Sequence, residues 1–372
     1  MTTKAIPLQF GGPVPHFAVR SPVNARFHFD TIAGRYVVLC FFGSAQAPAS
    51  RRLLDAVLAQ RQRFDDTNVA FFGVSVDPED EQSGRVREAL PGVHFFWDFD
   101  GAVSRQFGAL PAGDGSVERE RFRTFSLVLD ERLRVVASIP LGEDAERHLA
   151  QIIETLAGLP PLAQATAPMA PVLSVPRVFE PELCRALIRY YEERGGGESG
   201  FMREIDGKTV GVFDYSHKRR RDEEIKDEPL RRSCMVRVYN RLLPEIAKAF
   251  QFEATRIERY IVACYEAETG GHFRPHRDNT TKGTAHRRFA VSLVLNSEFE
   301  GGGLRFPEFG RHSYAPPAGG AVVFSCSLLH ELTPVTRGTR YAFLPFLYDE
   351  AAARIREENL SFVASPTPVT SA

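Results

Sequence analysis

The residues that could do chemistry gather late in the chain, where His276 and Asp278 stand two positions apart. On a β-strand, residues i and i+2 point to the same side, so this spacing can present an imidazole and a carboxylate to one metal ion. His330 ends the apolar run 320–330 and can supply a third ligand. These three side chains predict a metal site.

Two histidines and one carboxylate on one face leave coordination positions open, which is typical of a non-haem Fe(II) oxygenase. Arg340 follows ten residues after His330, at the head of the apolar run 341–348. An arginine buried beside such a site suits a dicarboxylate, because its planar fork binds a carboxylate through two hydrogen bonds. Order and spacing together favour an assembled site over a chance gathering of histidines.

Other residues of the same types give weaker signals. The spacing of His28 and Asp30 repeats the His-x-Asp triplet, but no partner is apparent, and we expect ordinary surface residues there. The basic run 218–221 is followed at once by the acidic run 222–224, which predicts a solvated, self-compensating stretch. Three further histidines stand in polar loop contexts and are expected to be solvated: His272, His286 and His312.

The elements that must position the metal site are short strands. Apolar runs punctuated by the glycine clusters 301–303 and 319–320 indicate an all-β double sheet or jelly roll. The expected strands are 257–265, 289–296, 304–306, 321–325 and 340–348. Two helical stretches precede them, over 181–191 and along an apolar stripe from residue 230 to 246 that Pro244 interrupts.

At this point the second half resembles the 2-oxoglutarate- and Fe(II)-dependent dioxygenases, in their prolyl-4-hydroxylase-like branch. The matching pattern is Tyr-x₄-Gly-x₅-His-x-Asp from Tyr265 to Asp278, then His330 and Arg340. The resemblance implies a double-stranded β-helix with flanking helices. It also implies that His276, Asp278 and His330 hold Fe(II), that Arg340 grips the far carboxylate of 2-oxoglutarate, and that Tyr265 lines the same pocket.

The activity implied by this resemblance is hydroxylation of a C–H bond in a prolyl or other amino-acid residue. O₂ would be consumed and 2-oxoglutarate decarboxylated to succinate and CO₂, with ascorbate as reductant. In relatives, a segment that here contains Asp214, Tyr215 and Lys218 covers the active site, so these three are candidate substrate contacts.

The first half shows a different pattern of apolar residues, which predicts buried strands at 36–42, 69–76 and 124–129. An amphipathic helix between the first two gives a βαβ pattern and an α/β layer fold. This half resembles the peroxiredoxins of the thioredoxin superfamily over residues 7–157. The matching stretches are 12–17, 34–42 and 95–108.

In that family the first central strand leads into a Pro-x-x-x-Thr-x-x-Cys loop that carries the peroxidatic thiol. Here Gly43, Ala47 and Ser50 stand at the three defining positions. A serine hydroxyl is neither ionised nor nucleophilic enough to attack peroxide at neutral pH, so we expect no peroxidase activity. Ser50 is expected to cap a helix, and Cys40 to pack as a small apolar residue in its strand.

Composition bounds the remaining expectations. A chain of 372 residues favours two or three domains, at roughly 100–200 residues each. Proline and alanine dominate around residue 165, which divides the chain into a peroxiredoxin-like domain (7–160), a linker (161–172), an oxygenase domain (173–350) and a C-terminal tail (351–372).

A formal net charge of −1 argues against nucleic-acid binding, and no apolar run reaches the roughly 20 residues of a membrane span. Five scattered cysteines without a Cys-x-x-Cys pair fit a reducing, cytoplasmic setting. The expected partners are a protein or amino-acid substrate and, through the first domain, a second copy of the chain.

Two alternatives stay open. The chain could be a non-catalytic sensor or scaffold that binds iron and 2-oxoglutarate and uses its first domain to recruit a partner. The second is the nucleic-acid demethylase branch of the same superfamily. That branch is disfavoured because it places its 2-oxoglutarate arginine differently beyond the distal histidine, and because this chain lacks net positive charge.

Overall fold

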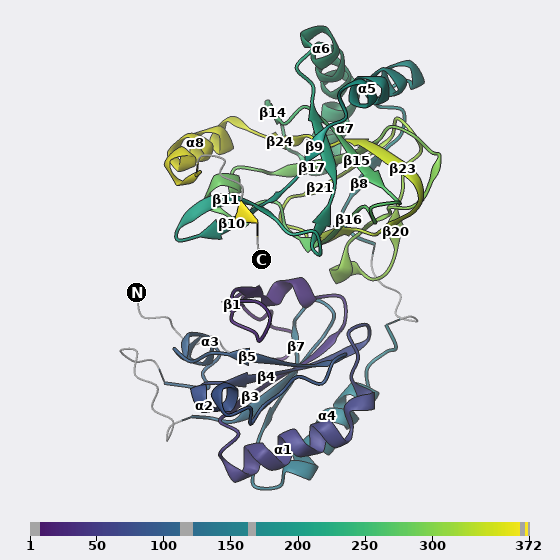
Figure 1. Cartoon of the computed structure of the whole chain (residues 1–372). Coiled ribbons are helices and arrows are strands. Elements are labelled where there is room, and N and C mark those ends of the chain that lie inside the picture. Colours follow the sequence, from purple (N-terminus) through teal and green to yellow (C-terminus); the bar gives the residue numbers. More distant parts are fainter. Residues whose placement is uncertain (1–7, 112–121, 163–168, 365–368, 371–372) are drawn as a thin grey trace. The chain divides into compact units, whose positions relative to one another are not determined.

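The computed structural model describes residues 8–111, 122–162, 169–364 and 369–370. The chain divides between residues 168 and 169 into two compact units, with the short segment Pro307–Arg311 grouped with the first (Figure 1). Helix α4 of the first unit ends at Ala157, and strand β8 of the second begins at Leu173. Within the described residues, every helix is too short or too polar to cross a bilayer.

The first unit is built on one five-stranded sheet. Strands β3, β4 and β5 are parallel, β6 runs antiparallel to β3, and β7 runs antiparallel to β6. Every residue of β3 is buried, which explains its continuous apolar run. In sheet order the strands are β5 (Val93–Trp97), β4 (Val69–Ser75), β3 (Tyr36–Gly43), β6 (Phe125–Leu129) and β7 (Val135–Pro140).

Helices cover one face of this sheet, and phenylalanines fill the other. The long helices α1 (Pro48–Ala59) and α4 (Ala145–Ala157) pack together on one side, as Figure 1 shows. Phenylalanine rings pack against one another on the opposite face, which accounts for part of the chain's 29 phenylalanines. The remaining elements are β1 (Ala18–Val19), β2 (Phe27–His28), η1 (Phe29–Ile32), η2 (Arg61–Arg63), α2 (Pro78–Gln82) and α3 (Ala102–Gln106). The thioredoxin-like α/β class expected from the sequence is confirmed.

Ser50 does not cap helix α1. Ala47 occupies the N-cap position, and Ser50 lies inside the first turn, where its buried hydroxyl donates to the Phe42 carbonyl at 2.7 Å. The hydroxyl thus ties the helix to the end of the central strand β3. The sequence missed this role because a serine near a helix start most often serves as the cap.

All five cysteines are buried. Burial raises the pKa of the Cys40 thiol, in the middle of β3, to about 12. Burial also raises the thiol pKa of the other four: Cys184 to about 11, Cys234 to about 12, Cys264 to about 11 and Cys326 well above its usual value.

The second unit contains a large sheet whose outer face is covered by helices. Its main path runs, in sheet order, through β14 (Arg256–Glu258), β24 (Phe346–Tyr348), β17 (Phe289–Val294), β23 (Val335–Phe343), β15 (Ile261–Glu266), β13 (Arg221–Glu224) and β9 (Gly197–Glu198). Strand β21 (Ala321–Ser325) joins β17 to β8 (Leu173–Val175), and β18 (Phe299–Gly301) pairs with β23.

A smaller sheet faces the large one and completes the jelly roll. Its order is β12 (Lys218–Arg219), β16 (His272–His276), β22 (His330–Leu332), β19 (Leu304–Arg305) and β20 (Ser313–Tyr314). A third sheet joins β10 (Phe201–Ile205), β11 (Lys208–Phe213) and β25 (Val369–Thr370). The jelly-roll class expected from the sequence is confirmed.

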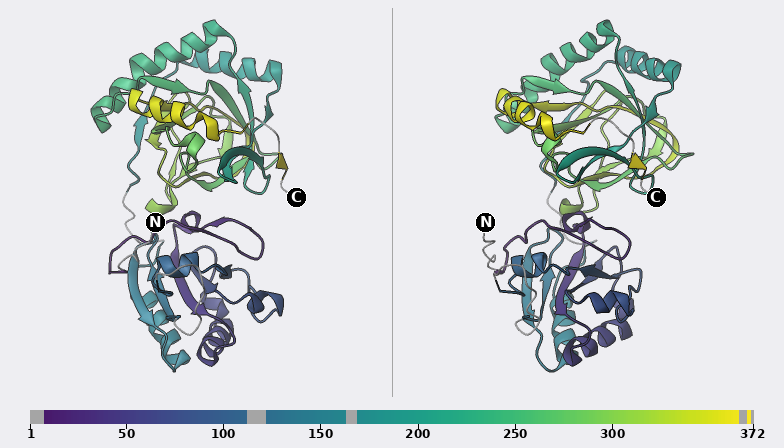
Figure 2. Two further views of the ribbon diagram at one scale, coloured as in Figure 1. Left: turned by 90° about the vertical axis from the view of Figure 1, so that its left-hand side faces the viewer. Right: turned by 60° about the vertical axis from the view of Figure 1, so that its left-hand side comes forward.

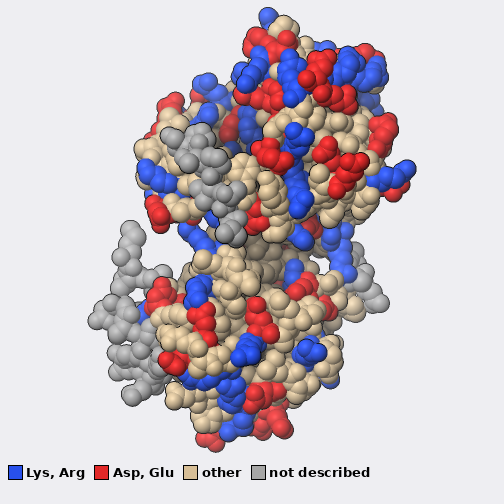
Figure 3. Space-filling model, viewed as in Figure 1, with Lys and Arg blue, Asp and Glu red and all other residues tan. Residues whose placement is uncertain are grey.

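The covering helices use the apolar stripe expected from the sequence. Cys234, Val238, Leu242 and Ile246 are fully buried, and the stripe bends through the π-helical segment η4 (Val238–Leu242) ahead of Pro244. Two turned views show these helices against the large sheet (Figure 2), and charges of both signs alternate over α5 and α6 (Figure 3). The helices are α5 (Pro181–Arg194), α6 (Glu228–Arg237) and α7 (Leu243–Phe250).

Two expected boundaries differ from the structure. The strand expected over 257–265 breaks at Arg259, whose φ of 65° lies in the left-handed region and cannot continue a strand. The tail expected from residue 351 begins instead as helix α8 (Glu350–Asn359), because the Asp349 side chain caps it by accepting from the Ala352 amide; η7 (Leu360–Phe362) follows.

We predict that Ser50→Ala lowers the free energy of unfolding of the first unit by about 1 kcal/mol, the net worth of a typical buried hydrogen bond. Trp97, the only tryptophan, lies in β5, so its fluorescence during urea unfolding of the full chain reports on this unit. Ser138→Ala, an exposed serine in β7, is the matched control and should change little. Equal stability of both variants would refute the role given to Ser50.

Candidate metal centre

The predicted ligands come together in the smaller sheet. His276 closes β16 and His330 opens β22, and the two residues are directly paired across these strands. Their rings lie 4.2 Å apart between centroids. The sequence placed His330 at the end of the run 320–330, but that run divides into β21, a turn and β22, so His330 starts a strand.

Asp278 lies two residues beyond the end of β16, at the start of a turn. Its backbone amide donates to the Cys326 carbonyl at 3.0 Å, which fixes the turn against the loop before His330. Asp278 Oδ1 is 3.7 Å from His276 Nε2, and its Oδ2 is 3.3 Å from His330 Nε2. One ligand atom of each residue lies within 4.8 Å of the others, and this is the single such trio of His, Cys, Asp or Glu in the described residues.

Both histidine rings are oriented as a metal requires. His276 Nδ1 lies 2.8 Å from the Arg274 carbonyl, and His330 Nδ1 lies 3.0 Å from the Leu328 carbonyl. A carbonyl can only accept, so Nδ1 carries a proton in each ring, and Nε2, which lies near Asp278, is the atom that remains for a metal. Burial, helped by the neighbouring His330, lowers the pKa of His276 well below its usual value, so this imidazole is neutral at pH 7.

Aromatic rings surround the two imidazoles. Phe273 stacks on His276 with ring centroids 3.5 Å apart, and Phe324 meets His330 edge-on at 4.6 Å. Such rings restrict the imidazole orientations and shield the site from water. This donor set, two imidazoles and a carboxylate on one side, fits Fe(II) with open coordination positions.

Arg340 lies inside the unit, 3% exposed, on β23 rather than at the head of a strand. Its Nη2 donates to Ser292 Oγ at 3.1 Å, whereas its buried Nη1 has no hydrogen-bond partner. A buried guanidinium with a free N–H is costly unless an anion fills the place. Arg340 therefore fits the far carboxylate of 2-oxoglutarate.

Tyr265 is paired directly with Arg340 across β15 and β23, so both side chains point to the same face. The Arg340 Cζ atom lies 5.5 Å from the centroid of the Tyr265 ring. The Tyr265 hydroxyl accepts from Arg220 Nη1 at 3.3 Å, which leaves its own proton free to donate. The structure thus brings Tyr265 beside Arg340.

The basic run 218–221 is only partly solvated, contrary to expectation. Lys218 and Arg220 are 5% and 6% exposed, and Arg220 forms a buried ion pair with Asp222 at 2.7 Å. The chain crosses from the smaller sheet to the large one at Arg220, between β12 and β13, which turns this side chain inward. Charge composition alone could not reveal this crossing.

Two further histidines pack inside the unit, and an expectation from the sequence exists for one of them, His286. His217, next to Lys218, contacts the Phe201 ring at 4.5 Å, and burial lowers its pKa to about 4. His286 is 2% exposed and pairs with Glu258 at 2.5 Å, although it was expected to be solvated. The Glu258 carboxylate also binds Arg287, whose Nη1 reaches the Asp278 carbonyl at 3.5 Å.

The other predicted residues lie apart from the ligands or at the edge of the site. His272 contacts the carbonyls of Gly270 and Ser216 through its two ring nitrogens. His28 and Asp30 lie in the first unit, and Asp30 is buried rather than a surface residue. Further residues named from the sequence are placed as follows: Asp214 is half-buried, and Tyr215 and His312 are exposed.

We predict that replacing any one ligand weakens Fe(II) binding by about 100-fold or more, since loss of residues that merely orient a ligand already costs about 10–100-fold. Anaerobic calorimetric titration of the metal-free full chain measures this for His276→Ala, Asp278→Ala and His330→Ala. His272→Ala, a change on the same strand β16, is the control and should bind iron like the parent chain. Undiminished binding in all three ligand variants would rule out this metal site.

Comparison with known families separates the two units. The model of the AhpC/TSA family matches residues 10–134, and that of the 2OG-Fe(II) oxygenase superfamily matches residues 260–348. The second match contains Tyr265, His276, Asp278, His330 and Arg340.

Curated relatives of the second unit are PKHD-type hydroxylases. One from Synechococcus sp. (strain JA-2-3B'a(2-13)) is 32% identical over 93 residues, 23% of this chain and 41% of that protein. One from Delftia acidovorans is 43% identical over 84 residues, 20% of this chain and 37% of that protein. The chain thus spans less than half the length of these two relatives.

Two solved structures are similar in fold. A prolyl-4-hydroxylase from Pseudomonas putida is 20% identical with a TM-score of 0.38, covering 54% of this chain and 99% of its own. The peroxidoxin BcpB from Mycobacterium tuberculosis is 19% identical with a TM-score of 0.34, covering 41% of this chain and 99% of its own. From the two family models and the curated relatives, the chain combines an N-terminal AhpC/TSA peroxiredoxin-like domain with a C-terminal 2OG-Fe(II) oxygenase domain related to the PKHD-type hydroxylases.

Proposed function

We propose that the chain is a dioxygenase that uses Fe(II) and 2-oxoglutarate to hydroxylate a C–H bond in a prolyl or other amino-acid residue. The observation that carries the proposal is the approach of His276, Asp278 and His330 within one ligand sphere, in the same jelly roll as the unpaired Nη1 of Arg340. Fe(II) needs the first three groups, and a dicarboxylate needs the fourth.

The chain's own residues supply binding and orientation. The Arg274 and Leu328 carbonyls hold the two imidazoles so that each Nε2 faces the metal position. Arg340 Nη1 receives the far carboxylate of 2-oxoglutarate, and Ser292 holds that guanidinium in place. The bound group supplies the oxidation: O₂ and 2-oxoglutarate give succinate and CO₂, and one oxygen atom enters the substrate C–H bond.

We predict that Arg340→Met weakens 2-oxoglutarate binding by about 100-fold, because it removes a bidentate charged contact from a buried site, while Fe(II) binding stays unchanged. Arg337→Met is the matched control on the same strand, since Arg337 is exposed and pairs with Glu300 at the surface. Anaerobic calorimetry gives both affinities. Equal 2-oxoglutarate affinity in the two variants would contradict the role of Arg340.

Turnover decides between an enzyme and a sensor. The full chain with Fe(II), 2-oxoglutarate, ascorbate and cell extract should form succinate, and His276→Ala should abolish it. Tight 2-oxoglutarate binding without succinate formation would favour the sensor or scaffold. Omitting ascorbate in a parallel reaction tests its proposed part as reductant.

We also propose that the first domain is not a peroxidase and instead joins two copies of the chain. Its Ser50 hydroxyl is bound to a carbonyl, and the nearby Cys40 thiol is buried with a pKa of about 12. Sedimentation equilibrium of the full chain tests for the dimer. A monomer at all protein concentrations would contradict the proposal.

We predict that the metal-free full chain, with a chelator and dithiothreitol present, consumes hydrogen peroxide no faster than buffer, because peroxide attack requires a thiolate. The loss of peroxide over time is the measurement. Catalytic consumption of peroxide would overturn the proposal, whichever residue causes it. The variant Cys40→Ala would then show whether the Cys40 thiol is responsible.

A further inference from the structure

Charged side chains inside the jelly roll are not balanced. Four cations of the described residues are buried in this domain, and a fifth, Arg259, is half-buried with a buried Nε; the four are Lys218, Arg220, Arg287 and Arg340. Arg220 is paired with Asp222, and Arg287 with Glu258. Asp278, the remaining carboxylate of the group, belongs to the proposed metal centre.

Three cations of this group therefore lack a carboxylate partner. Arg340 is assigned to 2-oxoglutarate. The Lys218 ammonium donates to two neutral acceptors, Ser199 Oγ and the Gly200 carbonyl, and burial lowers its pKa well below its usual value, so it can remain neutral. The charges of Asp222 and Asp278 act on Arg259, but within the described residues neither forms an ion pair or hydrogen bond with it.

Arg259 is held in place without a polar partner. Its buried Nε has no hydrogen-bond acceptor, and its Cζ lies over the Phe346 ring at 4.8 Å from the centroid. Arg287 lies against the same ring at 4.0 Å. Phe346 and Glu258 are cross-strand partners on one face, so this ring, and Arg259 with it, lies on the face that carries the Glu258–Arg287 pair.

The backbone of Arg259 is also unusual. Its φ of 65° is one that L-residues with long side chains rarely adopt, and it breaks the strand between β14 and β15. Such a conformation costs of order 1–3 kcal/mol and clusters at functional sites. Burial and the nearby Arg220 lower the pKa of Arg259 to about 10, so it still carries its charge at pH 7.

We propose that Arg259 forms a second carboxylate-binding subsite inside the oxygenase domain, and that it holds the substrate through a carboxylate. The inference rests on the proposed function and adds the substrate class. An amino-acid or peptide carboxylate suits the free guanidinium edge, which offers planar, charge-assisted hydrogen bonds. The carboxylate can come from a free α-carboxyl group or from an acidic side chain.

Three probes that differ only in whether and where they carry a carboxylate test this subsite. N-acetylglutamine carries an α-carboxylate, its isomer N-acetylglutamic acid α-amide carries a side-chain carboxylate, and N-acetylglutamine amide carries none. Each is titrated calorimetrically into the anaerobic full chain that holds Fe(II) and saturating 2-oxoglutarate. We expect at least one carboxylate probe to bind at least tenfold more tightly than the neutral probe, and the better isomer identifies the source.

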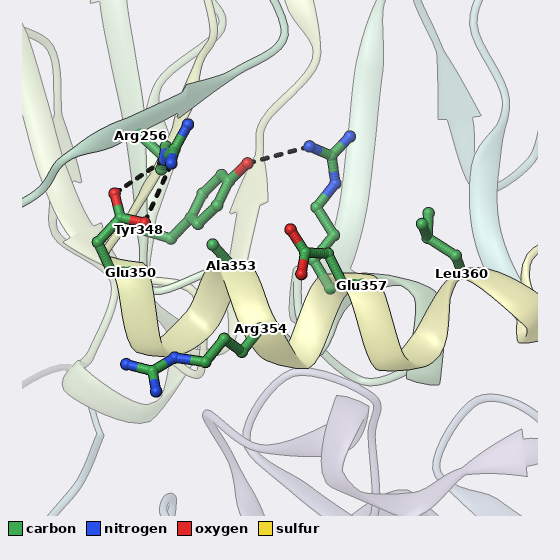
Figure 4. Close-up of a pocket in the computed structure, with 8 residues that line it drawn as sticks. Arg256, Tyr348, Glu350, Ala353, Arg354, Glu357 and Leu360 are labelled. Carbon is green, nitrogen blue, oxygen red and sulfur yellow. Dashed lines mark hydrogen bonds and ion pairs between the residues drawn. The ribbon is translucent and has the colours of Figure 1, made fainter.

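Arg259→Gln should lower the affinity for the better carboxylate probe to that for the neutral probe. Arg259→Lys keeps the charge and should retain most of the affinity for the carboxylate probe. Arg256→Gln is the matched control three residues earlier, because Arg256 pairs with Glu350 beside α8 at the surface (Figure 4). The inference is overturned if all three probes bind alike, if Arg259→Gln binds them like the parent chain, or if they compete with 2-oxoglutarate.

Affinities for Fe(II) and 2-oxoglutarate, measured on the same samples, separate this inference from the proposed function. Arg259→Gln should leave the affinities for Fe(II) and 2-oxoglutarate unchanged. Within the described residues, no hydrogen bond or ion pair joins Arg259 to the ligand trio or to Arg340. Failure of the parent chain to bind 2-oxoglutarate would count against the proposed function. Loss of the carboxylate preference alone would count against the subsite alone.

Discussion

The register between β16 and β22 sets the geometry of the candidate metal centre in the second domain. It pairs His276 with His330, and a bulge between Phe273 and His276 corrects the strand so that both imidazoles meet on one side. A slip of one residue would turn one imidazole to the opposite face of the sheet. The remaining features of the centre, the carbonyls behind each ring and the turn that carries Asp278, are useful only while this register holds.

Buried charge is the second constraint on this domain. Each guanidinium removed from water carries a desolvation penalty of several kcal/mol unless a counter-ion or hydrogen bonds compensate it. Arg220 and Arg287 have such partners in Asp222 and Glu258. Within the described residues Arg340 donates only to the Ser292 hydroxyl, so a bound anion would relieve a penalty that the folded chain already carries. A site prepared in this way favours anionic ligands over neutral molecules of the same shape.

The sequence predicted both fold classes, because continuous apolar runs mark the buried strands and amphipathic stripes mark the helices of each core. It also indicated the residues of the candidate metal centre, since His276 and Asp278 are close in sequence and His330 lies near a strand end. It failed for Lys218, Arg220 and His286, which look solvated from composition alone. Their burial follows from a crossing between sheets and from cross-strand partners, and these are long-range features that no local pattern contains.

The ends of several strands and helices also depend on the conformation or contacts of single residues. A left-handed backbone at Arg259 divided one expected strand into two, and the Asp349 cap turned an expected tail into helix α8. Ser50 acts through its bond to the Phe42 carbonyl rather than as a cap. In each case the residue type allowed several conformations, and tertiary contacts selected one.

The buried cysteines have a chemical consequence for the whole chain. Peroxide oxidises thiolates, whereas a protonated thiol reacts slowly, and all five thiols have raised pKa values and no solvent access. The chain therefore offers oxidants no ready route to a sulfenic acid or a mixed disulfide. Cys40, the single cysteine of the first domain, is thus protected from oxidants by the sheet that it helps to build.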